Sequence, residues 1–127
     1  MASIVLDSSA ILAHLNDEPG AEAVARFLGD AVICAVNYSE IVAKLVERGA
    51  VLALIRPALS RYGLEIAPFD EDLAERAGAL RAKTKSFGLS LGDRACLALA
   101  ERSRLPVLTA DRMWKDLDLH IEVQTLR

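Results

Sequence analysis

Four acidic residues stand at places in the sequence where a bound metal ion could be held. Asp7 directly follows the apolar run IVL, and Asp111 lies two residues beyond PVLT. Glu40 and Asp93 fall in the first turns of the helices expected after AVICA and LSLG. Carboxylate oxygens favour hard divalent cations, so the set points to Mg²⁺, with Mn²⁺ able to substitute, rather than to zinc or copper. A cation held there can activate water and neutralise developing negative charge.

Three of these acids also have a purely structural interpretation, which stays open at this point. Glu40 lies three residues after Asn37, which is the spacing of a capping box at the start of a helix. Asp93 stands in the same relation to Ser90. Asp111 fits a turn or an N-cap before RMWKDL.

Asp7 is the acid that capping explains least well. An acid at the end of a buried strand loses solvation, and this costs several kcal/mol unless a charged or metal partner compensates. Ser9 and Thr109 place hydroxyl groups beside Asp7 and Asp111, where they can orient a carboxylate or a bound water. Ser9 fits the N-cap of the first helix equally well.

The elements that position these acids alternate between short apolar runs and longer segments of helical period. Strands are expected over SIVL, AVICA, LEIAPF, PVLT and IEVQT. Helices are expected at residues 9–16, 21–28, 37–48, about 50–62, 71–85 after an Asp70 cap, and from about residue 90. This order predicts an α/β fold over residues 1–127 as one domain, a three-layer α/β/α sandwich with a mostly parallel central sheet. Because ligands of such sheets bind beyond the carboxyl ends of the strands, all four acids should face the same rim.

Composition limits the classes of function. The formal net charge is −3, which looks unfavourable for a nucleic-acid enzyme. Setting aside the four acids that would bind metal leaves a balance of +1, so a metal-loaded site could supply the attraction for phosphate. No apolar run is long enough to cross a bilayer and the first residues do not resemble a signal peptide, so we expect a cytoplasmic protein without membrane contact. Cys34 and Cys96 sit in apolar surroundings and are expected to be reduced and structural.

The chain resembles the PIN-domain endoribonucleases, and among them the VapC-type toxins of toxin–antitoxin pairs. The stretches that carry the resemblance are IVLDSSAILAHLNDEPG, AVNYSEIVAKL, LSLGDRACLALAERSRLPVLTAD and the closing IEV strand. They contain Asp7, Glu40, Asp93 and Asp111 in order and extend over nearly the whole chain.

The resemblance implies a single PIN-like nuclease domain that cleaves RNA phosphodiester bonds with a metal-activated water. In this family the four acids hold the metal and carry catalysis, the protein is a homodimer, and a small VapB-like antitoxin inhibits it. The sequence after Asp111 reads RMWKDLD, so Asp116 could assist or replace this fourth ligand. Arg94 and Arg112 are candidate phosphate contacts, although exposed arginines are more often simply surface residues.

Functions other than a nuclease place different demands on these residues. A magnesium-binding receiver-like signalling domain needs paired acids after the first strand, whereas Asp7 is followed by Ser8 and Ser9. A catalytically silent PIN-like interaction module is harder to exclude from sequence.

Apolar residues on three of the expected helices exceed one narrow stripe, and this predicts either a fully buried surface or a groove for an antitoxin helix or a dimer contact. They are Ile11, Leu12, Leu15, Ile41, Val42, Leu45, Val51, Leu52, Leu54 and Ile55.

Overall fold

The computed structural model describes all 127 residues and is built on a five-stranded sheet whose neighbouring strands are all parallel. The strands are β1 (Ile4–Leu6), β2 (Ala31–Cys34), β3 (Glu65–Ala67), β4 (Val107–Thr109) and β5 (Val123–Thr125), in the order β3-β2-β1-β4-β5. The central strand is β1, where Val5 lies opposite Val32 of β2 and Val107 of β4. The predicted parallel sheet is confirmed.

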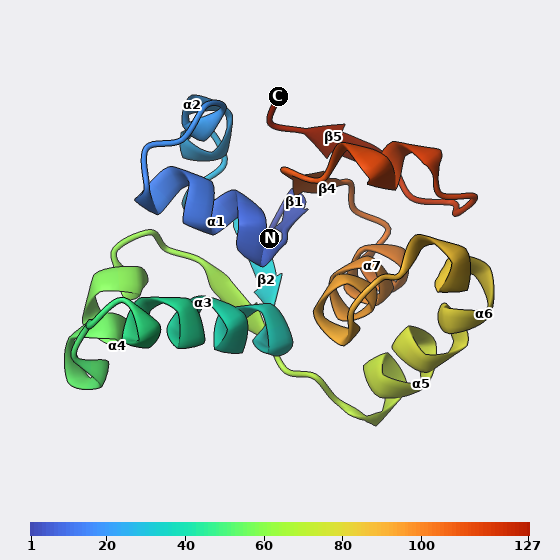
Figure 1. Cartoon of the computed structure of the whole chain (residues 1–127), viewed down its shortest axis with the longest axis horizontal. Coiled ribbons are helices and arrows are strands. Elements are labelled where there is room, and N and C mark those ends of the chain that lie inside the picture. Colours follow the sequence, from blue (N-terminus) through green and yellow to red (C-terminus); the bar gives the residue numbers. More distant parts are fainter.

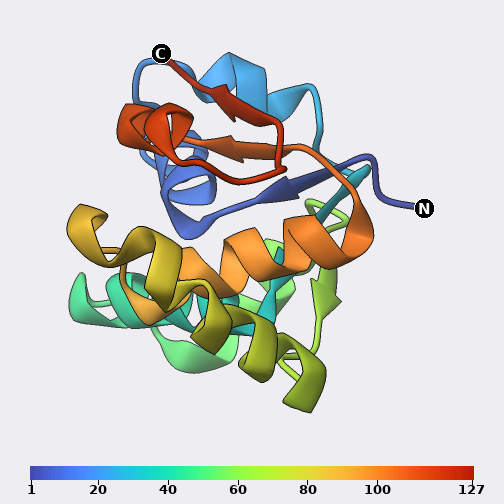
Figure 2. The same ribbon diagram turned by 90° about the vertical axis from the view of Figure 1, so that its right-hand side faces the viewer.

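Helices cover both faces of this sheet (Figures 1 and 2). On one face lie α1 (Ser8–Leu15), α2 (Ala21–Ala25), α3 (Ala35–Glu47) and α4 (Leu52–Ser60). On the other lie α5 (Glu71–Ala79), α6 (Arg81–Thr84) and α7 (Leu91–Ser103). The core is divided accordingly, since Ile4 and Leu6 pack toward α1–α4 and Val5 packs toward α5 and α7. The three-layer α/β/α sandwich is therefore confirmed.

Two helix starts differ from expectation, and both bear on the acidic residues. Asp7, not Ser9, is the N-cap of α1, and its carboxylate accepts a hydrogen bond from the backbone N–H of Ala10 at 2.9 Å. Helix α3 begins at Ala35 without a side-chain cap, so the Asn37–Glu40 capping box is absent and Asn37 lies inside the helix. Its side-chain N–H₂ instead donates to the Glu40 carboxylate and to the Gly92 carbonyl.

The helix expected over residues 71–85 is interrupted. Asp70 caps it as predicted, but α5 ends at Ala79, and α6 and a short 3₁₀ turn, η1 (Lys85–Phe87), follow. The hydroxyl of buried Thr84 bonds to the Leu80 carbonyl at 2.9 Å, and such back-bonding competes with regular helix geometry. A second 3₁₀ turn, η2 (Arg112–Asp116), joins β4 to β5.

Other differences are limited to lengths. The strand over LEIAPF is confined to Glu65–Ala67, because Pro68 has no N–H to continue the ladder. None of the helices is long and apolar enough to span a membrane.

Candidate metal centre

The carboxyl ends of β1 and β4 lie side by side at the point where the order of the strands in the sheet changes direction. From β1 the chain adds β2 and β3 on one side, and it later adds β4 and β5 on the other. Such a switch point leaves a crevice beyond the strand ends. Asp7 follows β1 and Asp111 follows β4, while the starts of α1, α3 and α7 lie close together near the middle of Figure 1.

Asp7 is the most buried acid of the chain, with 4% of its surface exposed. One carboxylate oxygen accepts hydrogen bonds from Ser9 Oγ at 2.7 Å and from the Ala10 N–H, and the other accepts from Thr109 Oγ1 at 2.6 Å. Burial raises the pKa of Asp7 to about 6; the hydrogen bonds oppose this rise and the charge of Asp93 adds to it. The predicted role of the Ser9 and Thr109 hydroxyls in orienting a carboxylate agrees with these contacts.

Glu40 lies against the start of α7. Its Oε1 accepts hydrogen bonds from Ser8 Oγ and from Asn37 Nδ2, both at 3.0 Å. The same Asn37 amide donates to the Gly92 carbonyl at 3.0 Å, and it is only 1% exposed. Glu40 is thus connected to α1 through Ser8 and to α7 through Asn37.

Asp93 and Asp111 both take part in helix caps, as their structural interpretation predicted. The Ser90–Asp93 capping box is complete, with the Ser90 N–H donating to Asp93 Oδ2 at 3.0 Å. Asp111 caps η2 through Met113 N–H at 2.9 Å. Thr109 joins Asp111 to Asp7, because its hydroxyl accepts from the Asp111 N–H and donates to the Asp7 carboxylate. Capping therefore accounts for one oxygen of each acid and leaves the second to be explained.

The second oxygens have no hydrogen-bond partner in the protein: Oε2 of Glu40, Oδ1 of Asp93 and Oδ2 of Asp111. An all-oxygen donor set beside a buried carboxylate suits a hard divalent cation in kind and in location. In the observed positions, however, no three histidine, cysteine or acidic side chains form a group that could hold one ion. Gathering these acids on an ion requires side-chain rotation, which the partial exposure of Asp93 and Asp111 permits.

A comparison with protein-family models matches residues 4–119 to the PIN domain. This chain belongs to the PIN-domain family. The match contains all four acids of the site. A comparison with curated protein sequences found no match.

Solved structures resemble this PIN domain over nearly its whole length. A toxin–antitoxin complex from Klebsiella pneumoniae contains a chain with 25% identity and a TM-score of 0.77, and 98% of each chain is covered. The DNA-bound VapBC of Salmonella typhimurium gives 20% identity, full coverage of both chains and a TM-score of 0.75. Mycobacterium tuberculosis VapC20, described as a sarcin-ricin loop cleaving toxin, gives 16% identity, coverage of 90% of this chain and 94% of that one, and a TM-score of 0.71. The last two likenesses support the fold alone.

Several ionisable residues of this PIN domain lie outside the site. His14 packs edge-on against the ring of Tyr62 at a centroid distance of 5.2 Å, and His120 is exposed. Asp116 is exposed at the end of η2. The Arg94 guanidinium donates to the Ala77 carbonyl at 2.9 Å, so it ties α7 to α5.

The two cysteines form no disulfide and are buried, as expected. Burial, and next the nearby charge of Asp7, hold the pKa of the Cys96 thiol well above its usual value. These thiols pack as small apolar groups.

Sequence reasoning missed three contributors to the site. Ser8 and Asn37 donate hydrogen bonds to Glu40, and the Glu40 carboxylate occupies the space that a side chain on Gly92 would fill. The only signal for Asn37 was its spacing to Glu40, which predicted capping bonds between these side chains and the backbone instead of a bond between the two side chains.

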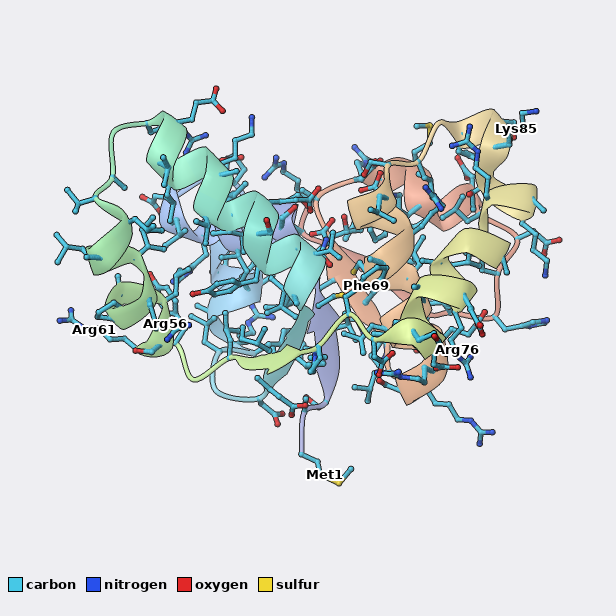
Figure 3. The ribbon with its side chains drawn as sticks, turned by 90° about the horizontal axis from the view of Figure 1, so that it is seen from below. Met1, Arg56, Arg61, Phe69, Arg76 and Lys85 are labelled. Carbon is cyan, nitrogen blue, oxygen red and sulfur yellow. The ribbon has the colours of Figure 1, made fainter.

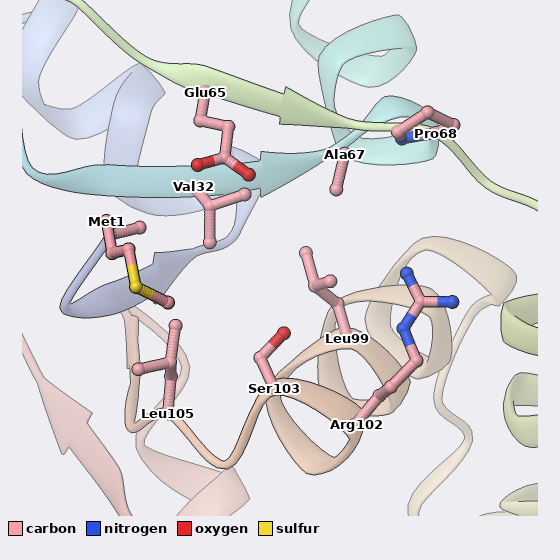
Figure 4. Close-up of a pocket in the computed structure, with 10 residues that line it drawn as sticks. Met1, Val32, Glu65, Ala67, Pro68, Leu99, Arg102, Ser103 and Leu105 are labelled. Atoms are coloured by element: carbon pink, nitrogen blue, oxygen red, sulfur yellow. The ribbon is translucent and has the colours of Figure 1, made fainter.

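The larger hollows of the surface do not contain any of the four acids. One of about 500 Å³ runs between β3 and the last turns of α7, from Met1 to Pro68 (Figure 4); Figure 3 also labels Met1. Arg102 on its wall is engaged with both oxygens of Asp70 at 3.0 Å. The candidate metal centre is thus an open rim outside these hollows.

Proposed function

We propose that this PIN domain is a Mg²⁺- or Mn²⁺-dependent endoribonuclease and the toxin of a toxin–antitoxin pair. The observation that carries the proposal is the buried Asp7 carboxylate at the end of β1, which is joined to Asp111 through Thr109 and affected by the charge of Asp93, while Glu40 lies against the start of α7. The likeness at 25% identity to a chain of a toxin–antitoxin complex supports the biological role. We assign metal binding and catalysis to all four acids.

A divalent cation held by these acids would supply Lewis acidity, which activates the attacking water and neutralises charge on the phosphodiester. The chain's own groups prepare the site for this. Ser9, Thr109 and the Ala10 N–H fix the orientation of Asp7, and Ser8 and Asn37 fix that of Glu40. The Ser90 cap holds Asp93 against the first turn of α7.

The partners follow from the same proposal. The substrate is single-stranded or loop RNA, and the inhibitor is a small VapB-like antitoxin that occupies the acidic rim. We further propose a homodimer that acts in the cytoplasm, with residues 1–127 forming one nuclease domain.

The proposal is tested with antitoxin-free protein and a structured RNA in Mg²⁺, Mn²⁺ or EDTA, followed by mapping of the RNA ends. Cleavage is expected with either metal and not with EDTA. Asp7→Asn keeps the side-chain shape but removes the negative charge, so cleavage should fall by at least about 100-fold while the fold survives. Asp17→Asn, at an exposed turn beyond α1, is the matched control and should cleave normally.

Two results would contradict the proposal. Undiminished cleavage by Asp7→Asn would reject the site. Absence of cleavage by the wild type with any metal would favour the catalytically silent interaction module.

A further inference from the structure

Gly92 occupies a position in α7 where glycine is not needed for backbone conformation. It is buried in the first turn of the helix, and its φ is not in the left-handed region. Glycine is less favourable than alanine at a helical position, because it loses more conformational freedom on folding. A reason for glycine must therefore come from its surroundings.

The surroundings are the carboxylate of Glu40. A methyl carbon on Gly92 would lie 2.5 Å from Glu40 Cδ and 2.6 Å from Oε1, and nearer still to Oε2. These separations are shorter than real contacts of a methyl group, so the carboxylate can stay in place only if residue 92 has no side chain.

The same carboxylate is held from the other side by Asn37. Both hydrogens of the Asn37 amide are used, one toward Glu40 Oε1 and one toward the Gly92 carbonyl. Its own Oδ1 is buried without any partner, an arrangement that is destabilising by itself. The opposite orientation of the amide would point Oδ1 at two acceptor oxygens, so the surroundings impose this one.

We infer that Gly92 is a positioning residue for the metal centre. Together with Ser8 and Asn37 it forms a carboxylate socket, the three residues that surround Glu40 and keep its carboxylate beside the first turn of α7 and Asp93. The inference rests on the proposed function, because the socket matters for catalysis only if Glu40 shares a cation with Asp93.

Gly92→Ala is expected to fold, because the clash is with the end of a flexible side chain that can swing away. Its thermal midpoint in EDTA should stay close to that of the wild type, since alanine favours the helix while the displaced Glu40 gives up its bonds to Ser8 and Asn37. The displaced Glu40 should weaken Mn²⁺ binding by about 10–100-fold, the usual cost of losing a group that orients a metal ligand. Free Mn²⁺ is measured by electron paramagnetic resonance without RNA.

Gly78→Ala is the matched control. Gly78 is also helical, and a methyl group there meets nothing within 4 Å, so Mn²⁺ affinity should be unchanged. A Glu40→Asp background gives a second control, because its shorter side chain withdraws from residue 92. Adding Gly92→Ala to Glu40→Asp should cause no further loss of affinity, which is the non-additivity expected of residues in contact.

A metal-free measurement tests the placement separately. The chain has only three side-chain amides, those of Asn16, Asn37 and Gln124. In an amide correlation spectrum in EDTA, Gly92→Ala should shift the Asn37 pair and leave the other two in place, and Gly78→Ala should shift none.

The inference is overturned if Gly92→Ala binds Mn²⁺ as tightly as the wild type, or if it leaves the Asn37 amide unmoved. An equal loss of affinity in the Glu40→Asp background would also overturn it, because the effect would then not pass through Glu40. Failure of the wild type to bind Mn²⁺ would instead reject the proposed function, and with it the role of the socket in metal binding. The amide shift would still report whether the socket exists.

Discussion

At the scale of single residues, Asp7 carries the largest conflict between stability and function. Its pKa is raised from 3.8 to about 6 by burial, so the charged carboxylate is disfavoured in the folded protein. A shift of about 2 units corresponds to about 3 kcal/mol. The folded state binds more protons than the unfolded chain between these two values, so the penalty is complete above pH 6 and is relieved as the pH falls toward 4.

We therefore expect Asp7→Asn to raise the unfolding free energy in EDTA at pH 7 by up to about 3 kcal/mol. The advantage over the wild type should shrink as the pH is lowered from 6 to 4, because the wild-type carboxyl then becomes neutral. Urea unfolding of both proteins between pH 4 and 7 measures this difference in unfolding free energy. A difference that does not change with pH would mean that Asp7 titrates equally in the folded and unfolded states.

At the scale of elements, the first turn of α7 serves capping and the metal centre together. Asp93→Asn keeps an oxygen that can accept a hydrogen bond from the Ser90 N–H. The free energy of unfolding in EDTA, measured by thermal melts, should therefore change by about 1 kcal/mol or less. The stabilisation given by Mn²⁺ should be lost, because the charge that binds the ion is gone. Ser90→Ala should show the reverse, with about 1 kcal/mol lost from the cap and the response to Mn²⁺ retained. If thermal melts show that Mn²⁺ stabilises both variants as much as it stabilises the wild type, Asp93 is a capping residue only.

The segment formed by α6 and η1 leads into that turn, and three of its exposed side chains are basic. Arg81, Lys83 and Lys85 are exposed and form no ion pair, while Leu80 and Thr84 are buried and anchor the segment. RNA entering the rim would pass these charges. Figure 3 shows Lys85 far from Arg61, which directly follows α4 on the other side of the molecule.

Replacing Arg81, Lys83 and Lys85 by Gln should weaken RNA binding in EDTA and lower its dependence on salt. The slope of log affinity against log salt should fall by about 0.7 for each phosphate contact removed from a single strand. A control with the same loss of charge replaces Arg26, Lys44 and Arg61, which are exposed elsewhere, by Gln. Equal slopes for the two triple variants would rule out a specific role for the segment.

At the scale of the whole molecule, the apolar surface is divided between core and exterior. Ile11, Ile41 and Ile55 of the predicted groove are buried in this chain and belong to its core. Leu52 and Leu54 of α4 are each 66% exposed and Val51 before the helix is 61% exposed, and such a concentration of exposed apolar side chains marks a candidate contact surface.

For the proposed homodimer we expect Leu52→Ser combined with Leu54→Ser to shift the solution mass at micromolar concentration from dimer to monomer. Light scattering after gel filtration measures the mass. Met113→Ser, which removes an exposed apolar side chain from η2, should remain dimeric. A wild-type protein that is monomeric at this concentration would refute the homodimer.

The sequence alone determined the order of elements, the parallel sheet and the four acids at its carboxyl edge. Apolar periodicity, the Asp70 cap and the Ser90–Asp93 capping box act within one or two turns of chain, so nearby residues are enough to predict them. The place of Asp7 and Asp111 after their strands followed from the same local patterns.

Only the tertiary structure decided which groups surround these acids. Thr109 reaches Asp7 across 102 positions of sequence, and Asn37 reaches Gly92 across 55. Such bonds depend on how closely packed helices approach one another, within a few tenths of an ångström, and no local pattern encodes that distance. The space that Gly92 leaves for Glu40 is set in the same way, because a missing side chain has meaning only when a neighbour from another helix fills its place.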